Sequence, residues 1–459
     1  MLSLLEIAER SQKGPKVDEK TWDLGLFAKM TELVRKYQIR VPKEPYHSWF
    51  CQDDALVERA FQAAVDFLVE KGVYCITTGR VIQFSREEVI EAIEAAPREV
   101  AMGEGRDRRI FRQQSIEGRG PLGFCPGHHS PFTEDLGSLV VKNFAQIDRT
   151  DFVEGFNFPA VDGREIFGLP LEAYAARREI AWMREGVRKA GRPGLAIVLY
   201  PINTRAAALL APIDPVGGLR PTDGVLLSIL PDVKIEHDLL TAAIVYEDYG
   251  CFRLSGSFAM AGGFCGGVEG AIVEGIVKPL AAMLCYHDYI SYVGVEHIQT
   301  LSALKILLQP FAFARSVVAQ ALNTRTHTIC MAWIIPTSGP CTENSLFEVA
   351  MRCVEAPING ANLYAPRHSR ARINAGQTPL EAEWMLEVSD AAIRAGLNHD
   401  SAGEILWRIA EKLGGRQPEP GLPIQECYDL VRHEPLPNYR QVYQKVKEEL
   451  SALGLTFAS

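Results

Sequence analysis

Eight short apolar runs alternate with longer amphipathic stretches between residues 121 and 365, and this alternation limits the possible folds most strongly. Near-continuous apolar runs are typical of parallel strands covered on both faces, and strands alternating with helices form a parallel sheet. Eight such units over about 250 residues predict an α/β fold, a TIM (β/α)8 barrel. The runs are PLGFC (121–125), FVEGFNF (152–158), GLAIVLY (194–200), GVLLSIL (224–230), CFRLSGSF (251–258), YISYVGV (289–295), TICMAWII (328–335) and ANLYA (361–365).

Helical patterns flank this region at both ends. Residues 20–96 are mostly helical in pattern, and Ser85-Arg-Glu-Glu88 forms a capping box at the start of one helix. The pattern from residue 379 to the end is helical again, interrupted by a Pro/Gly-rich segment at 414–423. We therefore expect three parts: an N-terminal helical extension (1–119), the barrel (120–375) and a C-terminal helical extension packed on the barrel (376–459).

Charge and cysteine usage exclude several classes of protein. The chain has 48 Lys and Arg against 57 Asp and Glu, a net charge of −9, so it offers no overall positive field for nucleic acid or an anionic membrane. Its ten cysteines are scattered without a C-x-x-C pair, which indicates buried thiols in a reducing compartment. With neither a signal-like apolar segment nor a membrane-length apolar run in the sequence, we expect a cytoplasmic protein.

Residues that follow the barrel strands are the candidates for catalysis, because TIM-barrel active sites lie at the C-terminal ends of the strands. His128 and His129 follow the first strand, where two imidazoles would bind zinc or donate a proton, or else form a solvated turn. Glu296 and His297 follow the sixth strand and match zinc-ligand chemistry, although neighbouring strand residues face opposite ways and one of the two would then belong to the core. We predict these four as catalytic, with His128, His129 and His297 as candidate zinc ligands. No H-E-x-x-H motif in the sequence supports a metal independently.

A glycine-rich segment, AGGFCGGVEG (261–270), follows the fifth strand. It lacks the ordered G-x-G-x-x-G pattern and the Walker lysine, so nucleotide binding is disfavoured. The glycines instead permit close approach of another backbone or of a planar ligand. Trp333, near the end of the seventh strand, would either wall an aromatic pocket or belong to the core.

Several long segments resemble the monomethylamine:corrinoid methyltransferase family. They extend over almost the whole chain in order, which makes chance agreement implausible. The resemblance implies a TIM barrel that hands a methyl group to the cobalt of a separate corrinoid protein. The segments are 72–89, 103–111, 130–135, AGRPGLAIV (190–198), AGGFCGGVE (261–269), SGPCTENSLFE (338–348) and 424–457.

The departures from this family concern the amine-binding pocket. Directly after AGRPG the methylamine enzymes carry pyrrolysine, and the matching position here is Val198. Their acidic pocket residue falls near Gly256, and their glutamine and tyrosine near the seventh strand fall at Trp333 and Ile335. The resemblance thus implies a member lacking pyrrolysine, in which Val198, Gly256, Phe264, Trp333 and Ile335 form a substrate pocket for another methyl donor.

An apolar, aromatic-walled pocket favours a methoxylated aromatic donor, as in methoxyarene O-demethylase methyltransferases. The first alternative is a methylated or quaternary amine such as glycine betaine, held in a cation–π cage. A barrel lyase or decarboxylase using Arg253, or a non-catalytic small-molecule binding protein, are further alternatives. Expected partners are a corrinoid protein and a small-molecule methyl donor, with zinc as a candidate cofactor and a homo-oligomer as the expected assembly.

Overall fold

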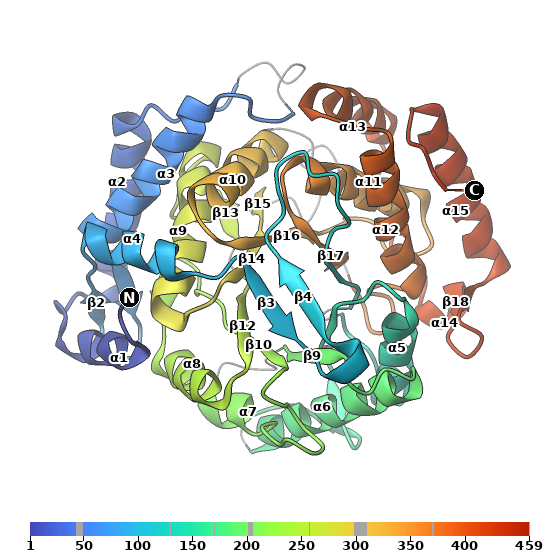
Figure 1. Cartoon of the computed structure of the whole chain (residues 1–459), viewed down its shortest axis with the longest axis horizontal. Helices are drawn as coiled ribbons and strands as arrows, with labels where there is room; N and C mark the ends of the chain where they lie inside the picture. Colours follow the sequence, from blue (N-terminus) through green and yellow to red (C-terminus); the bar gives the residue numbers. More distant parts are fainter. Residues whose placement is uncertain are drawn as a thin grey trace.

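Eight parallel strands form a closed barrel surrounded by helices (Figure 1). The computed structural model describes residues 1–42, 49–127, 130–168, 170–200, 205–256, 258–297, 310–369 and 371–458. The barrel strands follow one another around the barrel in chain order, each beside the next. They are β5 (Phe124–Cys125), β6 (Phe152–Glu154), β9 (Ala196–Leu199), β10 (Gly224–Leu226), β12 (Phe252–Ser255), β14 (Ile290–Val293), β16 (Ile329–Ile334) and β17 (Asn362–Pro366).

The barrel closes where β17 pairs with β5 and where backbone hydrogen bonds join β5 to β6. The Asp151 N–H donates to the Phe124 carbonyl at 2.9 Å, and the Glu154 N–H donates to the Gly127 carbonyl at 3.2 Å. All eight strands overlap the apolar runs of the sequence, so the predicted TIM barrel is confirmed.

A ring of helices covers the outside of the strands. The helix α9 is buried on nearly all sides, because helices of the N-terminal extension pack over its outer face. The ring contains α5 (Glu134–Gln146), α6 (Leu171–Lys189), α7 (Ala206–Leu210), α8 (His237–Tyr249), α9 (Val268–Tyr286), α10 (Phe311–Arg325), α11 (Glu343–Ile358) and α12 (Pro379–Arg394).

The N-terminal extension packs against one side of the barrel and closes its N-terminal end. Two of its strands, β1 and β2, form a small sheet with β11 of the barrel region. The extension consists of α1 (Leu4–Lys13), α2 (Glu19–Lys36), α3 (Asp54–Glu70), β1 (Val73–Cys75), β2 (Arg80–Ile82), α4 (Arg86–Ala95), β3 (Glu99–Met102), the short 3-10 helix η1 (Gly105–Asp107) and β4 (Arg109–Arg112); β11 is Lys234–Ile235.

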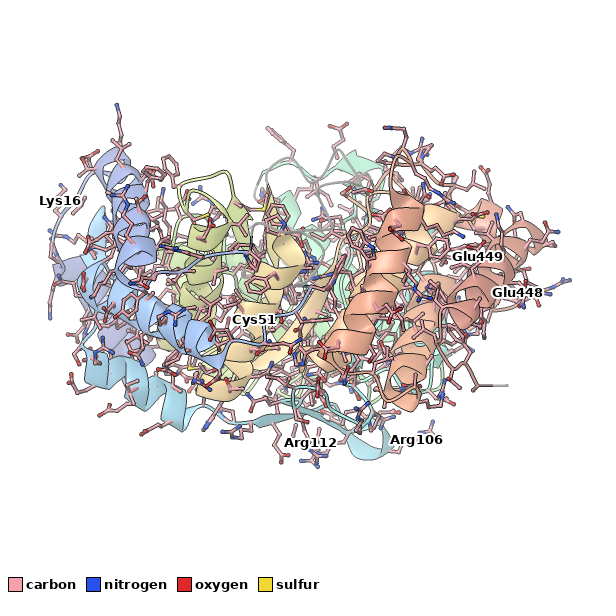
Figure 2. All side chains as sticks on the ribbon, turned by 90° about the horizontal axis from the view of Figure 1, so that it is seen from above. Lys16, Cys51, Arg106, Arg112, Glu448 and Glu449 are labelled. Atoms are coloured by element: carbon pink, nitrogen blue, oxygen red, sulfur yellow. The ribbon has the colours of Figure 1, made fainter. Side chains whose placement is uncertain are left out.

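The β3–β4 hairpin acts as a plug. Met102 and Phe111 point into the barrel, where the Phe111 ring lies 5.4 Å from the ring of Phe152 at the start of β6. The outer side of the hairpin is charged, and Figure 2 shows Arg106 and Arg112 along one edge of the molecule. The barrel is therefore sealed at this end, and a ligand must enter from the opposite end.

The C-terminal extension contains α13 (His399–Leu413), α14 (Ile424–Cys427), the two-stranded β18 (Tyr428–Asp429) and β19 (Glu434–Pro435), and α15 (Pro437–Ala452). Both α13 and α15 pack on α11 of the ring. The division of the chain at residues 119 and 375 stays a prediction. Two further short pairs lie between barrel elements: β7 (Ala160–Val161) with β8 (Arg164–Glu165), and β13 (Ala259–Ala261) with β15 (Val295–His297).

None of the helices in the described ranges is both long and apolar enough to cross a membrane.

The capping box at the start of α4 is present as the sequence predicts. Ser85 Oγ accepts from the Glu88 N–H at 3.2 Å, and Glu88 accepts from the Ser85 N–H at 2.9 Å. Ser85→Ala should lower the free energy of unfolding by about 1 kcal/mol in denaturant titration, because an N-terminal amide loses its acceptor. Ser451→Ala in α15, where the hydroxyl only bonds back to the Lys447 carbonyl, is the matched control and should change stability by less. An equal loss of unfolding free energy in the two variants would contradict the role of Ser85 as a helix cap.

Candidate active site

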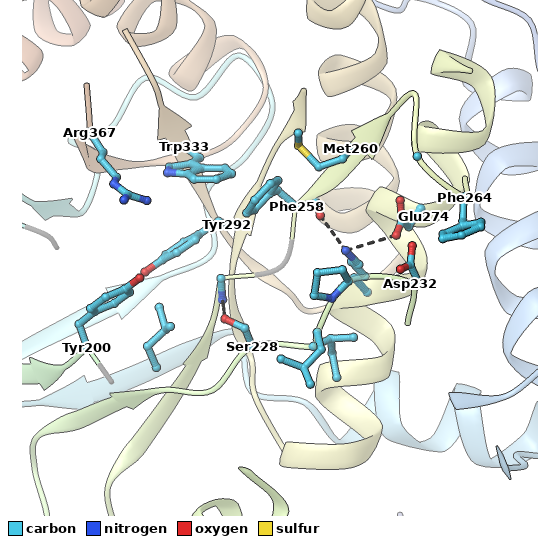
Figure 3. A pocket seen from close by; sticks show the side chains of 17 residues that line it. Tyr200, Ser228, Asp232, Phe258, Met260, Phe264, Glu274, Tyr292, Trp333 and Arg367 are labelled. Carbon is cyan, nitrogen blue, oxygen red and sulfur yellow. Dashed lines mark hydrogen bonds and ion pairs between the residues drawn. The ribbon is translucent and has the colours of Figure 1, made fainter. Parts of the chain in front are cut away.

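A cavity of about 280 Å³ lies at the C-terminal ends of the barrel strands, opposite the hairpin plug (Figure 3). Its lining comes from the ends of six barrel strands, β9, β10, β12, β14, β16 and β17, and from the segments that follow them. The residues are Tyr200, Leu226, Ser228, Ile229, Leu230, Pro231, Asp232, Gly256, Phe258, Met260, Gly263, Phe264, Glu274, Lys278, Tyr292, Trp333 and Arg367. This is the position at which TIM-barrel enzymes bind their substrates.

Aromatic rings form one wall of the cavity. The rings of Phe258 and Trp333 lie 3.9 Å apart, and the Tyr292 ring lies 6.4 Å from that of Trp333. Tyr200 and Phe264 also line the cavity, Phe264 with 40% of its surface exposed. Flat apolar faces of this kind bind an aromatic ring by stacking, or a quaternary ammonium by cation–π attraction.

Below this wall, a buried carboxyl group joins two tyrosines. The Tyr292 hydroxyl donates to the Tyr364 hydroxyl at 2.6 Å, the Tyr364 hydroxyl donates to the Glu154 carboxyl, and Glu154 Oε1 lies 3.0 Å from the Tyr292 hydroxyl. Glu154 is fully buried, and burial raises its pKa well above the usual range. The carboxyl group therefore keeps its proton to a higher pH than an exposed carboxyl group does, and the three groups form a closed hydrogen-bonded network beside the cavity.

One end of the cavity carries paired charges. Lys278 Nζ lies 3.2 Å from Glu274 on the same helix and donates to the Phe258 carbonyl at 3.0 Å. The Asp232 carboxylate lies beside this pair in Figure 3. Burial, with the nearby charge of Glu274, raises the pKa of Asp232. This end therefore carries two carboxyl groups and one ammonium group, so it is negative in sum when both carboxyl groups are ionised.

The opposite end holds the guanidinium of Arg367. Arg367 directly follows β17, and its backbone N–H donates to the Ile334 carbonyl at 2.9 Å. Its side chain extends along the cavity wall near Trp333 (Figure 3). Burial raises the pKa of the Tyr200 phenol, and the positive charge of Arg367 reduces that rise.

Comparison with known proteins identifies the family. The model of the family "Monomethylamine methyltransferase MtmB" matches residues 2–455. The chain belongs to the MtmB family. The monomethylamine methyltransferase MtmB1 of Methanosarcina barkeri is 27% identical over 98% of this chain and 97% of its own length, and MtmB of Methanosarcina mazei is also 27% identical over the same shares.

The fold comparison agrees with the sequence comparison. A crystal structure of the Methanosarcina barkeri MtmB superimposes with a TM-score of 0.89 at 25% identity, covering 99% of this chain and 98% of that one. A structure described as the hydroxylamine MtmB complex matches equally well. The barrel and both extensions are therefore shared along the whole chain.

Four of the five predicted substrate-binding residues lie in or directly beneath the cavity. Gly256, Phe264 and Trp333 line it, while Val198 is buried inside the barrel, two positions before the lining residue Tyr200. A Cβ at Gly256 would lie only 2.9 Å from Ser228 Oγ and 3.1 Å from the Tyr292 ring. A side chain at this position would therefore require the side chains of Ser228 and Tyr292 to shift. Contact of these residues with a methyl donor stays a prediction.

Ile335 and Glu296 lie instead around a smaller cavity of about 30 Å³ on the outer side of β16. Glu296 lies 3.9 Å from Arg315, and burial raises its pKa to about 7. Arg315 is also paired with Glu355 at 3.0 Å. Glu296 is thus part of a buried ionic cluster and does not line the large cavity; its catalytic role stays a prediction.

The predicted imidazoles are not placed by the structure. His128 and His129 lie outside the described residues, and for His297 the backbone alone is described, paired with Ala261 through β15 and β13. Within the described ranges no group of three or more His, Cys, Asp or Glu side chains is arranged to hold a metal ion. The side chains of His128, His129 and His297 are not described, so zinc binding stays a prediction.

Arg253, the cation considered for a lyase, faces away from the cavity. It donates to the Tyr286 carbonyl at 2.8 Å and lies 3.7 Å from Glu247. In the described part of the chain, the guanidinium that lines the cavity is that of Arg367, which was not predicted from the sequence. Glu154 and Tyr292 were not predicted either, although a charged residue inside an apolar strand such as FVEGFNF indicates a buried polar network.

Proposed function

We propose that this protein transfers the methyl group of a methoxylated aromatic compound to the corrinoid of a separate protein. The aromatic-walled cavity at the barrel's C-terminal end is the observation that carries the proposal. Membership of the MtmB family supports methyl transfer to a corrinoid protein. Burying a neutral ring there gains about 25 cal/mol per Å² of apolar area, whereas a small ammonium without a carboxylate or carbonyl partner costs several kcal/mol.

The reaction requires a proton for the leaving oxygen. The acceptor cobalt, as Co(I), supplies the electron pair for the new bond to the methyl carbon, while the C–O pair remains on the oxygen. A phenol with a pKa near 10 leaves better than its phenolate, so protonation of the ether oxygen accelerates the step. Tyr292 would give this proton by turning its O–H from Tyr364 to the ether oxygen, and Tyr364 and Glu154 would then replace the proton in sequence.

A test of this proposal identifies the products. Guaiacol incubated with the enzyme and a reduced corrinoid protein should give catechol in equal amount to the methylated corrinoid. Omitting the corrinoid protein should abolish catechol formation, which separates methyl transfer from a lyase or hydrolase reaction. Binding of guaiacol without any product would instead favour a non-catalytic binding protein.

A quaternary amine such as glycine betaine is the second candidate donor. The rings of Trp333, Phe258 and Tyr292 favour it, because cation–π attraction holds a quaternary ammonium. The carboxylates of Glu274 and Asp232 add negative charge at one end of the same cavity. A quaternary amine leaves as a neutral amine without needing a proton, so its demethylation should be insensitive to the loss of the Tyr292 hydroxyl.

His128, His129, Glu296 and His297 remain proposed catalytic residues, and zinc remains a proposed cofactor. Three histidine ligands, or two with Glu296, would leave one position open for the ether oxygen. Elemental analysis of the purified protein should then find about one zinc per chain, and His128→Ala should lower that content. Protein that contains no zinc and is fully active would contradict zinc involvement and leave the Tyr292 network as the proton source.

A further inference from the structure

Two buried or half-buried hydrogen-bond donors at one end of the cavity have no acceptor in the part of the chain that the structure describes. The Arg367 side chain makes no hydrogen bond or ion pair with the described residues. The Trp333 side chain is 95% buried, and its Nε1 has no partner among those residues either. Figure 3 shows the indole nitrogen on the side of the ring that faces Arg367.

This arrangement differs from that of other enclosed cations in the protein. Arg315 and Arg352 both pair with Glu355, at 3.0 Å in the case of Arg315, and Lys278 in the same cavity pairs with Glu274. A buried donor without an acceptor costs free energy, and a guanidinium more than a neutral group. Two such donors at the same end of one cavity therefore indicate an acceptor that arrives with the ligand.

The backbone holds Arg367 in this position. Its N–H donates to the Ile334 carbonyl at 2.9 Å, and the Ser369 N–H donates to the Pro336 carbonyl at 2.8 Å. Both bonds tie the segment after β17 to the end of β16, the strand that carries Trp333. Neighbouring strands of the barrel thus carry the guanidinium and the indole N–H to the same cavity.

We propose that Arg367 and the Trp333 indole N–H bind a carboxylate of the methyl donor. The inference rests on the proposed function and narrows it to an anionic donor. A planar carboxylate accepts two parallel bonds from the guanidinium fork, which a hydroxyl group does not. The body of the donor then lies against the aromatic wall, toward Tyr292. A methoxybenzoate and an N-methylated amino acid share this carboxylate chemistry.

Binding measured by calorimetry on the full chain tests the inference with matched ligands. Vanillate and guaiacol differ by one carboxylate, and so do glycine betaine and tetramethylammonium. Wild-type protein should bind the acid of at least one pair about tenfold or more tightly than its neutral or cationic partner. Equal affinity within both pairs would overturn the inference without any use of variants.

Variants assign the effect to the two donors. Arg367→Gln should weaken the binding of vanillate about 10- to 100-fold and change the affinity for guaiacol by less than about twofold. Trp333→Phe keeps a ring but removes the N–H, so it should reduce the preference for the acid by a smaller factor. Arg372→Gln is the matched control, because Arg372 is exposed in the same segment outside the cavity. Equal weakening of acid and neutral ligands by Arg367→Gln would overturn the inference in favour of a structural role.

Methyl-transfer assays separate this inference from the proposed function. If wild type uses vanillate and guaiacol with equal kcat/KM and Arg367→Gln changes neither, methoxyarene demethylation stands and the carboxylate site is overturned. If vanillate binds through Arg367 but transfers no methyl group while glycine betaine does, the carboxylate site stands and the methoxyarene function fails. Loss of turnover with unchanged donor binding in Arg367→Gln would place Arg367 against the partner's corrinoid and overturn the inference.

Discussion

Replacing Tyr292 with phenylalanine should lower kcat for a methoxylated donor by roughly 10²- to 10⁴-fold, the range typical of general acid catalysis. The ring stays against Trp333, so KM should change little. The change removes the hydroxyl that we propose as proton donor, and it leaves Glu154 and Tyr364 in place. Steady-state kinetics with guaiacol and a reduced corrinoid protein measure both constants.

Tyr286→Phe is the matched control for this prediction. Tyr286 is equally buried, and its hydroxyl has no hydrogen-bond partner among the described residues, so its loss should leave kcat unchanged. Glu154→Gln should alter the pH dependence of kcat, because the group that reprotonates the tyrosines no longer ionises. A Tyr292→Phe enzyme with wild-type kcat would rule out the network as the proton source.

The raised pKa of Glu154 also makes the stability of the folded protein depend on pH. Burial raises it above its value in the unfolded chain, so the folded state binds more protons between those two pKa values. Stability from this group is therefore full below the unfolded pKa and falls as the pH rises toward the folded pKa. Glu154→Gln should flatten this part of the stability profile in denaturant titrations at several pH values.

Trp333→Ala should raise KM for a methoxylated aromatic donor roughly 10- to 100-fold and lower kcat less. Losing roughly 55–110 Å² of apolar contact between this ring face and the donor, at about 25 cal/mol per Å², gives this factor, and the wall contacts the donor's ring and not the reacting bond. Initial rates over a wide range of guaiacol concentrations separate the two constants. The deletion also removes a side chain packed on Phe258, so thermal unfolding must show that the variant is folded at the assay temperature.

Trp333→Phe keeps an aromatic wall and is the matched control for Trp333→Ala. With guaiacol, which has no carboxylate, it should retain a KM within a few-fold of wild type. An unchanged KM in Trp333→Ala would mean that the donor does not stack on this wall, and the methoxyarene proposal would lose its main support.

The barrel was predictable because its strands are largely buried on both faces and therefore mostly apolar. Glu154 was not selected, since its partners Tyr292 and Tyr364 are 138 and 210 positions away in sequence and only the closed barrel brings them together. Local patterns describe neighbours along the chain, whereas this network depends on contacts across the barrel.

The position of Glu296 could not be predicted for a different reason, the course of its strand. The pattern treats YISYVGV as one strand followed by Glu296, but the structure has two strands, β14 and β15, that separate at Gly294. The second strand pairs with β13 instead of continuing the barrel, and Glu296 then lies against Arg315. Arg367 was missed because it stands in a basic segment, PRHSR, that is typical of a solvated loop.

The most direct test of the central claim compares methyl donors by the absorbance of the corrinoid protein's cobalt. We predict rapid loss of the Co(I) spectrum with guaiacol, vanillate or syringate, and slow loss with monomethylamine, because neither Val198 nor Gly256 has a side-chain acceptor for a methylammonium and Glu274 is already paired with Lys278. Methyl transfer from monomethylamine or glycine betaine at a rate well above the rates for all three methoxylated compounds would contradict the assignment of the donor. No methylation of the cobalt by any of these donors would contradict corrinoid methyl transfer itself.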